Sequence, residues 1–264
     1  MPGSANVAIR AANVDLRVQR AGAGAPLVFL PDAHIGAAWL PFHERLSDHF
    51  EVILLEHPGY GGGDAPPWLD RVTDLANFYL DALMQLDLTR VHLVGAALGG
   101  WVAAELATRN TARLASLTLI DPWGLRVDGA GGIDLFARAD EQALHDLSFD
   151  PKKAEALALR VLAPENEDAL LKGRMMTAKL AWQPRLFDPH LGHWLHRIDV
   201  PALILWGRED RLLPTAYGAA WQAAIPGARL SVVANAGHWP HLEQAAETAD
   251  IVHHFIAQQR AASF

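Results

Sequence analysis

A short apolar strand, a turn rich in glycine and an alanine-rich helix follow one another between residues 91 and 107. The strand reads Val-His-Leu-Val, and the turn reads Gly-Ala-Ala-Leu-Gly-Gly. Small residues on both sides of position 97 let the strand and the helix approach closely, and they tolerate a strained backbone at the apex. The sequence therefore predicts a sharp strand-turn-helix unit with Ala97 at its apex.

This layout is that of a nucleophile elbow, in which Gly-x-Ser-x-Gly places a serine at the apex. Here the apex residue is Ala97, within Gly95-Ala-Ala-Leu-Gly99. Downstream, an apolar strand is followed by Asp210, and the loop Asn-Ala-Gly-His ends at His238. The nucleophile position, the acid and the histidine follow in the order of the α/β-hydrolase family. The chain resembles that family over nearly its whole length.

The resemblance implies an α/β fold with a mostly parallel, doubly wound sheet. Residues 1-124 and 198-264 are expected to form the core domain. Between residues 125 and 197 the strand pattern gives way to polar helical segments, which predicts a helical cap inserted after the sixth strand. The resemblance also assigns roles, with Asp210 as the acid that orients His238. The alternative for the elbow is a tight turn without any catalytic role.

The loop that begins Pro31-Asp32 replaces the His-Gly pair usual in the family. The two amide donors of an oxyanion hole are expected at Ala33 and Leu98. A carboxylate at Asp32 would oppose the developing negative charge unless it points away or is protonated. His34 either faces the pocket as an additional acid or base, or is a solvated loop residue.

Other candidate site residues lie at a strand end and in the cap. Asp121 follows the predicted strand 114–120 and is a second candidate for the acid that orients the histidine. Four side chains are predicted to line the substrate pocket, with packing inside the protein as the alternative: Trp123, Trp182, Arg185 and Trp239. The apolar cap favours a small neutral or aromatic-bearing carbonyl compound as the substrate.

Alternation and periodicity predict the remaining elements. Residues 5–20 are expected to form an antiparallel hairpin at the sheet edge, and residues 70–86 an amphipathic helix. Three cap helices are predicted at 134–147, 151–162 and 166–182. Histidines at 190, 193 and 196 recur every three residues, but this spacing sweeps them around a helix, so we predict no metal site.

Composition narrows the class of protein. The 264 residues are 51% hydrophobic and 20% charged. This length and this apolar content are enough to form one large core in a soluble protein. We expect a cytoplasmic monomer or homodimer. There is no cysteine, which excludes disulfides, thiolate metal sites and a cysteine nucleophile. A net charge of -8 argues against nucleic acid as a partner. The expected partner is a small molecule, with no cofactor and no membrane.

The alanine at the apex of the elbow leaves three hypotheses for the function. An alanine methyl cannot attack a carbonyl, so no acyl-enzyme is expected at Ala97. One hypothesis is an ester or C–C bond hydrolase inactivated by a serine-to-alanine change. Another is a natural enzyme that uses His238 as a general base, and the resemblance offers cofactor-free oxygenation, lyase chemistry and isomerisation as precedents. A third is a small-molecule binding protein without catalysis. The unusual Pro31-Asp32 pair favours a natural alanine.

Overall fold

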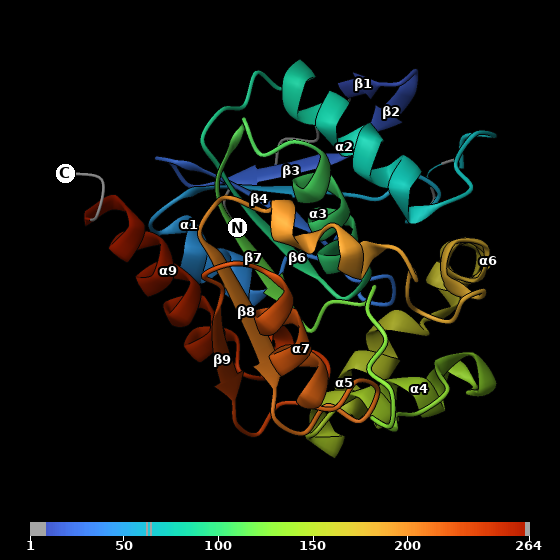
Figure 1. Ribbon diagram of the computed structural model, residues 1–264. Helices are drawn as coiled ribbons and strands as arrows, with labels where there is room; N and C mark the ends of the chain where they lie inside the picture. The colour runs from blue at the N-terminus through green and yellow to red at the C-terminus, as the bar shows by residue number, and fades with distance from the viewer. Residues whose placement is uncertain (1–8, 62, 64, 262–264) are drawn as a thin grey trace.

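A seven-stranded, mostly parallel sheet forms the centre of the computed structural model, which describes residues 9–61, 63 and 65–261 (Figure 1). The strand order is β3-β5-β4-β6-β7-β8-β9, and β3 runs antiparallel to its neighbour β5. The strands are β3 (Val18–Ala21), β4 (Pro26–Leu30), β5 (Glu51–Leu55), β6 (Val91–Ala96), β7 (Leu114–Ile120), β8 (Ala202–Gly207) and β9 (Arg229–Val233). The predicted fold class is confirmed.

Continuous apolar runs explain why the middle strands lie inside the protein. Every residue of β6 and of β8 is buried, and β4 is exposed only partly at its first residue. Strands that are covered on both faces have such runs, whereas a strand with one wet face alternates. The strand that leads into the elbow is β6, which pairs with β4 on one side and β7 on the other.

The N-terminal hairpin differs from its prediction. β1 (Ile9–Ala11) and β2 (Val14–Leu16) pair as a separate two-stranded sheet, and β3 is the edge strand of the main sheet. Ala12 and Asn13 form the turn with φ of 48° and 64°, as a two-residue hairpin loop requires. Residues 5–8 lie outside the described residues. Since three strands precede β4, the helical insertion follows the seventh described strand and not the sixth.

Helices cover both faces of the sheet. α2 packs against α3, and α1 packs against α9, and the two pairs lie on opposite sides of the strands (Figure 1). The predicted helix 70–86 is confirmed as α2. The core helices are α1 (Pro41–Ser47), α2 (Val72–Gln85), α3 (Leu98–Arg109), α7 (Ala216–Ala224), α8 (Pro240–Glu243) and α9 (Ala245–Ala261). No helix in the described part of the chain combines the length and the apolar character needed to cross a membrane.

The segment between β7 and β8 is helical, as the loss of strand pattern predicts. Its helices α4, α5 and α6 lie together at one side of the sheet (Figure 1). The elements are η1 (Leu135–Ala137), α4 (Asp140–Leu147), α5 (Pro151–Val161), η2 (Pro164–Asn166), α6 (Glu167–Ala181), η3 (Leu191–His193) and η4 (Leu195–Arg197). Because η4 contacts the core helix α3, the last part of the segment returns to the core before β8 begins.

Close backbone contacts fix the turn between β6 and α3. Ala97 has φ 48° and ψ -110°, a conformation that residues with a Cβ adopt only under strain. A Cβ added to Gly99 would lie 2.1 Å from the carbonyl oxygen of Leu30. The glycine therefore lets the start of α3 touch the end of β4, and this contact keeps the elbow sharp.

We predict that Gly99→Ala lowers the melting temperature by roughly 5 °C or more, because backbone atoms and not a flexible side chain would have to move. Differential scanning calorimetry measures the change. Gly131→Ala is the matched control, since a Cβ there meets no heavy atom within 4 Å. Equal melting temperatures for the two variants would contradict this account of the elbow.

Candidate active site

The structure places Ala97 at the apex of the elbow, in the position of a nucleophile. The residue is buried, with 1% of its surface exposed. Its amide donates to the carbonyl of Ile120 at 2.9 Å, and its carbonyl accepts from the amides of Trp101 and Trp123 at 3.0 and 3.1 Å. The scaffold of the elbow is complete, and the group at its tip is a methyl.

His238 and Asp210 lie together as the sequence predicts. The Nδ1 atom of His238 lies 2.7 Å from Oδ2 of Asp210, and both side chains are fully buried. The other carboxylate oxygen of Asp210 accepts the amides of Leu212 and Leu213, at 2.8 and 3.1 Å. The carboxylate is thus fixed by its own loop, and it holds the imidazole with a proton on Nδ1.

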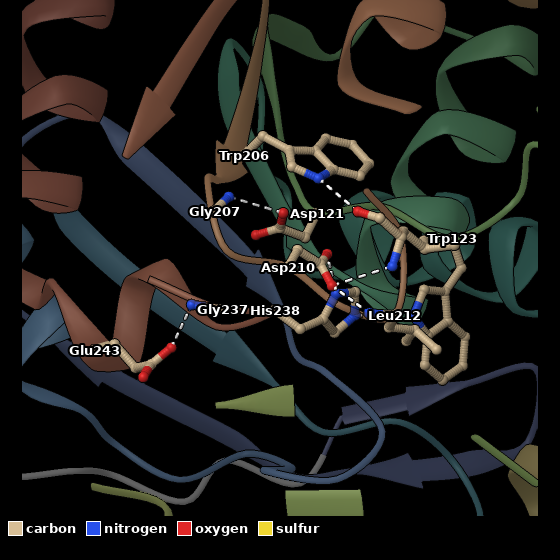
Figure 2. Close-up of polar contacts among 10 residues, drawn as sticks. Asp121, Trp123, Trp206, Gly207, Asp210, Leu212, Gly237, His238 and Glu243 are labelled. Atoms are coloured by element: carbon tan, nitrogen blue, oxygen red, sulfur yellow. Dashed lines mark hydrogen bonds and ion pairs between the residues drawn. The ribbon is translucent and has the colours of Figure 1, made fainter. Parts of the chain in front are cut away.

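Trp123 occupies the other side of the imidazole. Its indole N–H donates to Nε2 of His238 over 3.0 Å, and Figure 2 shows Trp123 and Asp210 on either side of the ring. A serine hydroxyl at position 97 would donate to the same nitrogen in an intact triad. Trp123 therefore supplies the hydrogen bond that Ala97 cannot. A buried nitrogen left without a partner would cost about 1–3 kcal/mol.

Opposing effects act on the pKa of His238. Burial lowers it, but the charge and hydrogen bond of Asp210 and the charge of Asp32 outweigh burial and raise the pKa above its usual value. The indole N–H of Trp123 acts against this rise, because a protonated Nε2 would be a donor facing a donor. The hydrogen bond from Trp123 thus favours the neutral ring.

Asp121 lies next to Asp210 and not on the histidine. Its Oδ1 accepts the amide of Gly207 at 3.0 Å, and its buried Oδ2 makes no hydrogen bond to another described residue. Burial and the charge of Asp210 raise the pKa of Asp121 well above its usual value. Ligand-type atoms of Asp121, Asp210 and His238 lie within 4.8 Å of one another.

Glu243 connects the histidine loop to the helical segment between β7 and β8, a role that the sequence did not reveal. One carboxylate oxygen accepts the amide of Gly237 at 2.6 Å (Figure 2). The other accepts the amide of Phe149 at 2.8 Å. In addition, the amide of His238 donates to the carbonyl of Leu147 at 2.7 Å. The Glu243 carboxylate and this backbone hydrogen bond therefore join the histidine loop to the segment between β7 and β8, and no sequence motif marks either contact.

The loop expected to form the oxyanion hole is held by hydrogen bonds among its own residues. Oδ1 of Asp32 accepts the amides of His34 and Ile35 at 2.6 and 3.0 Å, so the carboxylate turns toward the residues after Ala33. Burial acts to raise the pKa of Asp32, but the hydrogen bonds and charge of His34 and the charge of His238 hold it well below its usual value. A charged, buried carboxylate beside the expected hole at Ala33 and Leu98 opposes an oxyanion there.

A cavity with a volume of about 740 Å³ lies between this loop and the helical segment that joins β7 to β8. Its lining is mostly apolar and includes Ala33, His34, Tyr60, Leu135, Phe136, Leu144, Val161, Leu170, Met175 and Trp182. Ala97, Asp210 and His238 are absent from this lining, and each is at least 95% buried. The cavity and the predicted triad positions are therefore separate.

Three of the predicted pocket residues lie elsewhere. Trp123 and Trp239 have no exposed surface, because they pack around His238. Arg185 forms an ion pair with Asp134 and stacks on the ring of Trp182, with 4.7 Å between the guanidinium carbon and the ring centroid. Trp182 does line the cavity. Trp123 and Arg185 each have a partner distant in sequence, His238 and Asp134, which no local pattern marks.

The sheet, the elbow and the histidine–carboxylate pair define a protein of hydrolase type. A family model described as the alpha/beta hydrolase fold matches residues 30–245. The chain belongs to this family.

Similar proteins come from both sequence and structure. A 2-hydroxy-6-oxononadienedioate/2-hydroxy-6-oxononatrienedioate hydrolase of Cupriavidus pinatubonensis is 28% identical over 250 residues, covering 85% of this chain and 84% of the relative. The crystal structure of a bacterial membrane phospholipase A superposes with a TM-score of 0.82 at 23% identity, over 98% of this chain and 87% of that one. A 2-hydroxy-6-oxo-6-phenylhexa-2,4-dienoate hydrolase from a Rhodococcus species superposes with 0.80 at 18% identity, over 97% and 100%.

We predict that Trp123→Phe raises the pKa of His238 relative to the unsubstituted protein, because the variant loses the N–H that favours neutral Nε2. Nitrogen-15 NMR of the histidine side chains over a pH series measures this value. Trp239→Phe is the control, since the Trp239 indole N–H makes no hydrogen bond in the described structure while its ring also lies near His238. A pKa that rises equally in both variants would contradict the role given to Trp123.

Proposed function

We propose that this α/β-hydrolase-fold chain binds a small neutral or aromatic-bearing carbonyl compound beneath its cap and does not act as a serine hydrolase. The single observation that carries the proposal is the separation of the 740 Å³ cavity from Ala97 and His238. The apolar lining of the cavity and its size suit a compound of this kind. The names of the sequence relatives support a carbonyl compound, because they act on hydroxy-oxo acids.

Three features support binding without hydrolysis. Ala97 offers no attacking atom, so no acyl-enzyme can form there. The indole N–H of Trp123 donates to Nε2 of His238, the atom that would accept the nucleophile's proton. Asp32 brings a charge beside the expected oxyanion hole. The nucleophile is thus absent, the indole of Trp123 occupies Nε2 of His238, and the charge of Asp32 opposes an oxyanion.

A second candidate function is general-base catalysis by His238, as in a cofactor-free oxygenase, lyase or isomerase. One observation favours it: Asp210 holds Nδ1 and leaves Nε2 as an acceptor, which is the tautomer that a base requires. This chemistry needs a conformation in which Trp123 leaves His238 and the ring meets the cavity. Loss of turnover in His238→Gln, with unchanged ligand affinity, would distinguish it from binding alone.

We predict that Ala97→Ser by itself gives no measurable release of p-nitrophenol from p-nitrophenyl acetate, because Trp123 already occupies Nε2 of His238. The double variant Ala97→Ser, Trp123→Gly should hydrolyse the ester at least about tenfold faster than Trp123→Gly alone, since the serine can then reach the histidine. Hydrolysis by the single serine variant at the rate of the double variant would show that Trp123 does not block the site.

We predict that acetophenone binds to the cavity and that Trp182→Ala weakens its affinity by roughly fivefold or more, since this ring lines the cavity wall. Ligand-observed NMR titration measures the affinity. Trp194→Ala is the matched control, because Trp194 is exposed to a similar degree (51% against 46%) and lies outside the cavity lining. No binding of acetophenone, or equal loss in both variants, would contradict the proposed site.

A further inference from the structure

We propose that Asp32 and His34 form a second acid–base pair, which faces the cavity and binds a small phenol as its phenolate. The inference rests on the proposed function for its binding cavity, and it goes beyond that function by adding phenols to the carbonyl compounds proposed above. It places the reactive imidazole of this protein on the loop after β4, and not at His238.

The two side chains are arranged as a histidine backed by a carboxylate. Nδ1 of His34 lies 3.5 Å from Oδ1 of Asp32, and the carboxylate is completely buried. Nδ1 is itself buried, whereas the side chain as a whole is 22% exposed and lines the cavity. The accessible part of the ring is therefore the edge away from Asp32, where Nε2 lies. One nitrogen faces the carboxylate and the other faces the ligand space.

The carboxylate of Asp32 is fixed in its charged form. The amides of His34 and Ile35 donate to Oδ1, and the hydrogen bonds and charge of His34 together with the charge of His238 outweigh the effect of burial and lower the pKa of Asp32. Oδ2 is buried and makes no hydrogen bond within the described structure. A negative charge close to an imidazole stabilises the protonated form of such a ring.

The surroundings of His34 select an aromatic ring with an acidic hydroxyl. Phe136 and Trp182 pack edge to face, 5.0 Å apart, in the cavity wall that His34 also lines, so an aromatic ring can pack against them. In the proposed step the phenol O–H bond breaks and its proton forms an N–H bond with Nε2. The phenolate then faces an imidazolium that Asp32 stabilises.

The probe is p-nitrophenol, whose phenolate and phenol absorb at different wavelengths. At a pH where half of the free probe is ionised, binding should raise the ratio of phenolate to phenol by roughly fivefold or more. His34→Gln should abolish this rise, because no acceptor remains. Asp32→Asn should reduce it, since the amide keeps an oxygen for the two backbone donors but loses the charge. Circular dichroism confirms that both variants are folded.

Two further variants separate this pair from other groups. His190→Gln, at an exposed histidine outside the cavity, should leave the rise unchanged. Arg160 also lines the cavity, and loss of the rise in Arg160→Gln but not in His34→Gln would assign the phenolate to that cation and overturn the proposal. If acetophenone binds but p-nitrophenol binds without any rise, only the acid–base pair is wrong. If neither compound binds, the proposed function fails as well.

Discussion

The hydrogen bond from Trp123 to His238 determines what this hydrolase fold can do. It gives a fully buried imidazole its second partner, and together with Asp210 it fixes the tautomer of the ring. Trp123 can reach the ring because its own amide is bonded to the carbonyl of Ala97, so the elbow itself positions the residue that covers the histidine. The strained apex, which in a hydrolase presents a nucleophile, here serves to anchor a tryptophan.

The hydrogen bond from Trp123 to His238 also explains why the cavity is separate from the pair His238 and Asp210. Two indoles pack around His238, and the cavity meets the core at the loops after β4 and β5. On the loop after β4 the polar side chain that lines the cavity is His34, with the buried carboxylate of Asp32 next to it. A departure from the family pattern at the nucleophile is thus accompanied by a departure at the neighbouring loop, where Pro31-Asp32 stands.

The resemblance to the α/β-hydrolase family predicted the positions of Ala97, Asp210 and His238, because the elbow, the acid and the histidine follow in the family's order along the chain. The sheet and the cap helices were predictable because apolar runs and helical periods are local signals. The partner of a side chain is not a local property. Packing between segments distant in sequence decides that Trp123 faces His238 and that Arg185 pairs with Asp134.

The most direct test of this account is the accessibility of each histidine to diethyl pyrocarbonate, which modifies neutral and exposed imidazoles. Mass spectrometric peptide mapping of the native protein should show rapid modification of His34, while His238 stays unmodified until the protein is unfolded. In Trp123→Gly, His238 should become reactive. Modification of His238 in the native protein as fast as that of His34 would contradict the claim that Trp123 closes the histidine off from the cavity.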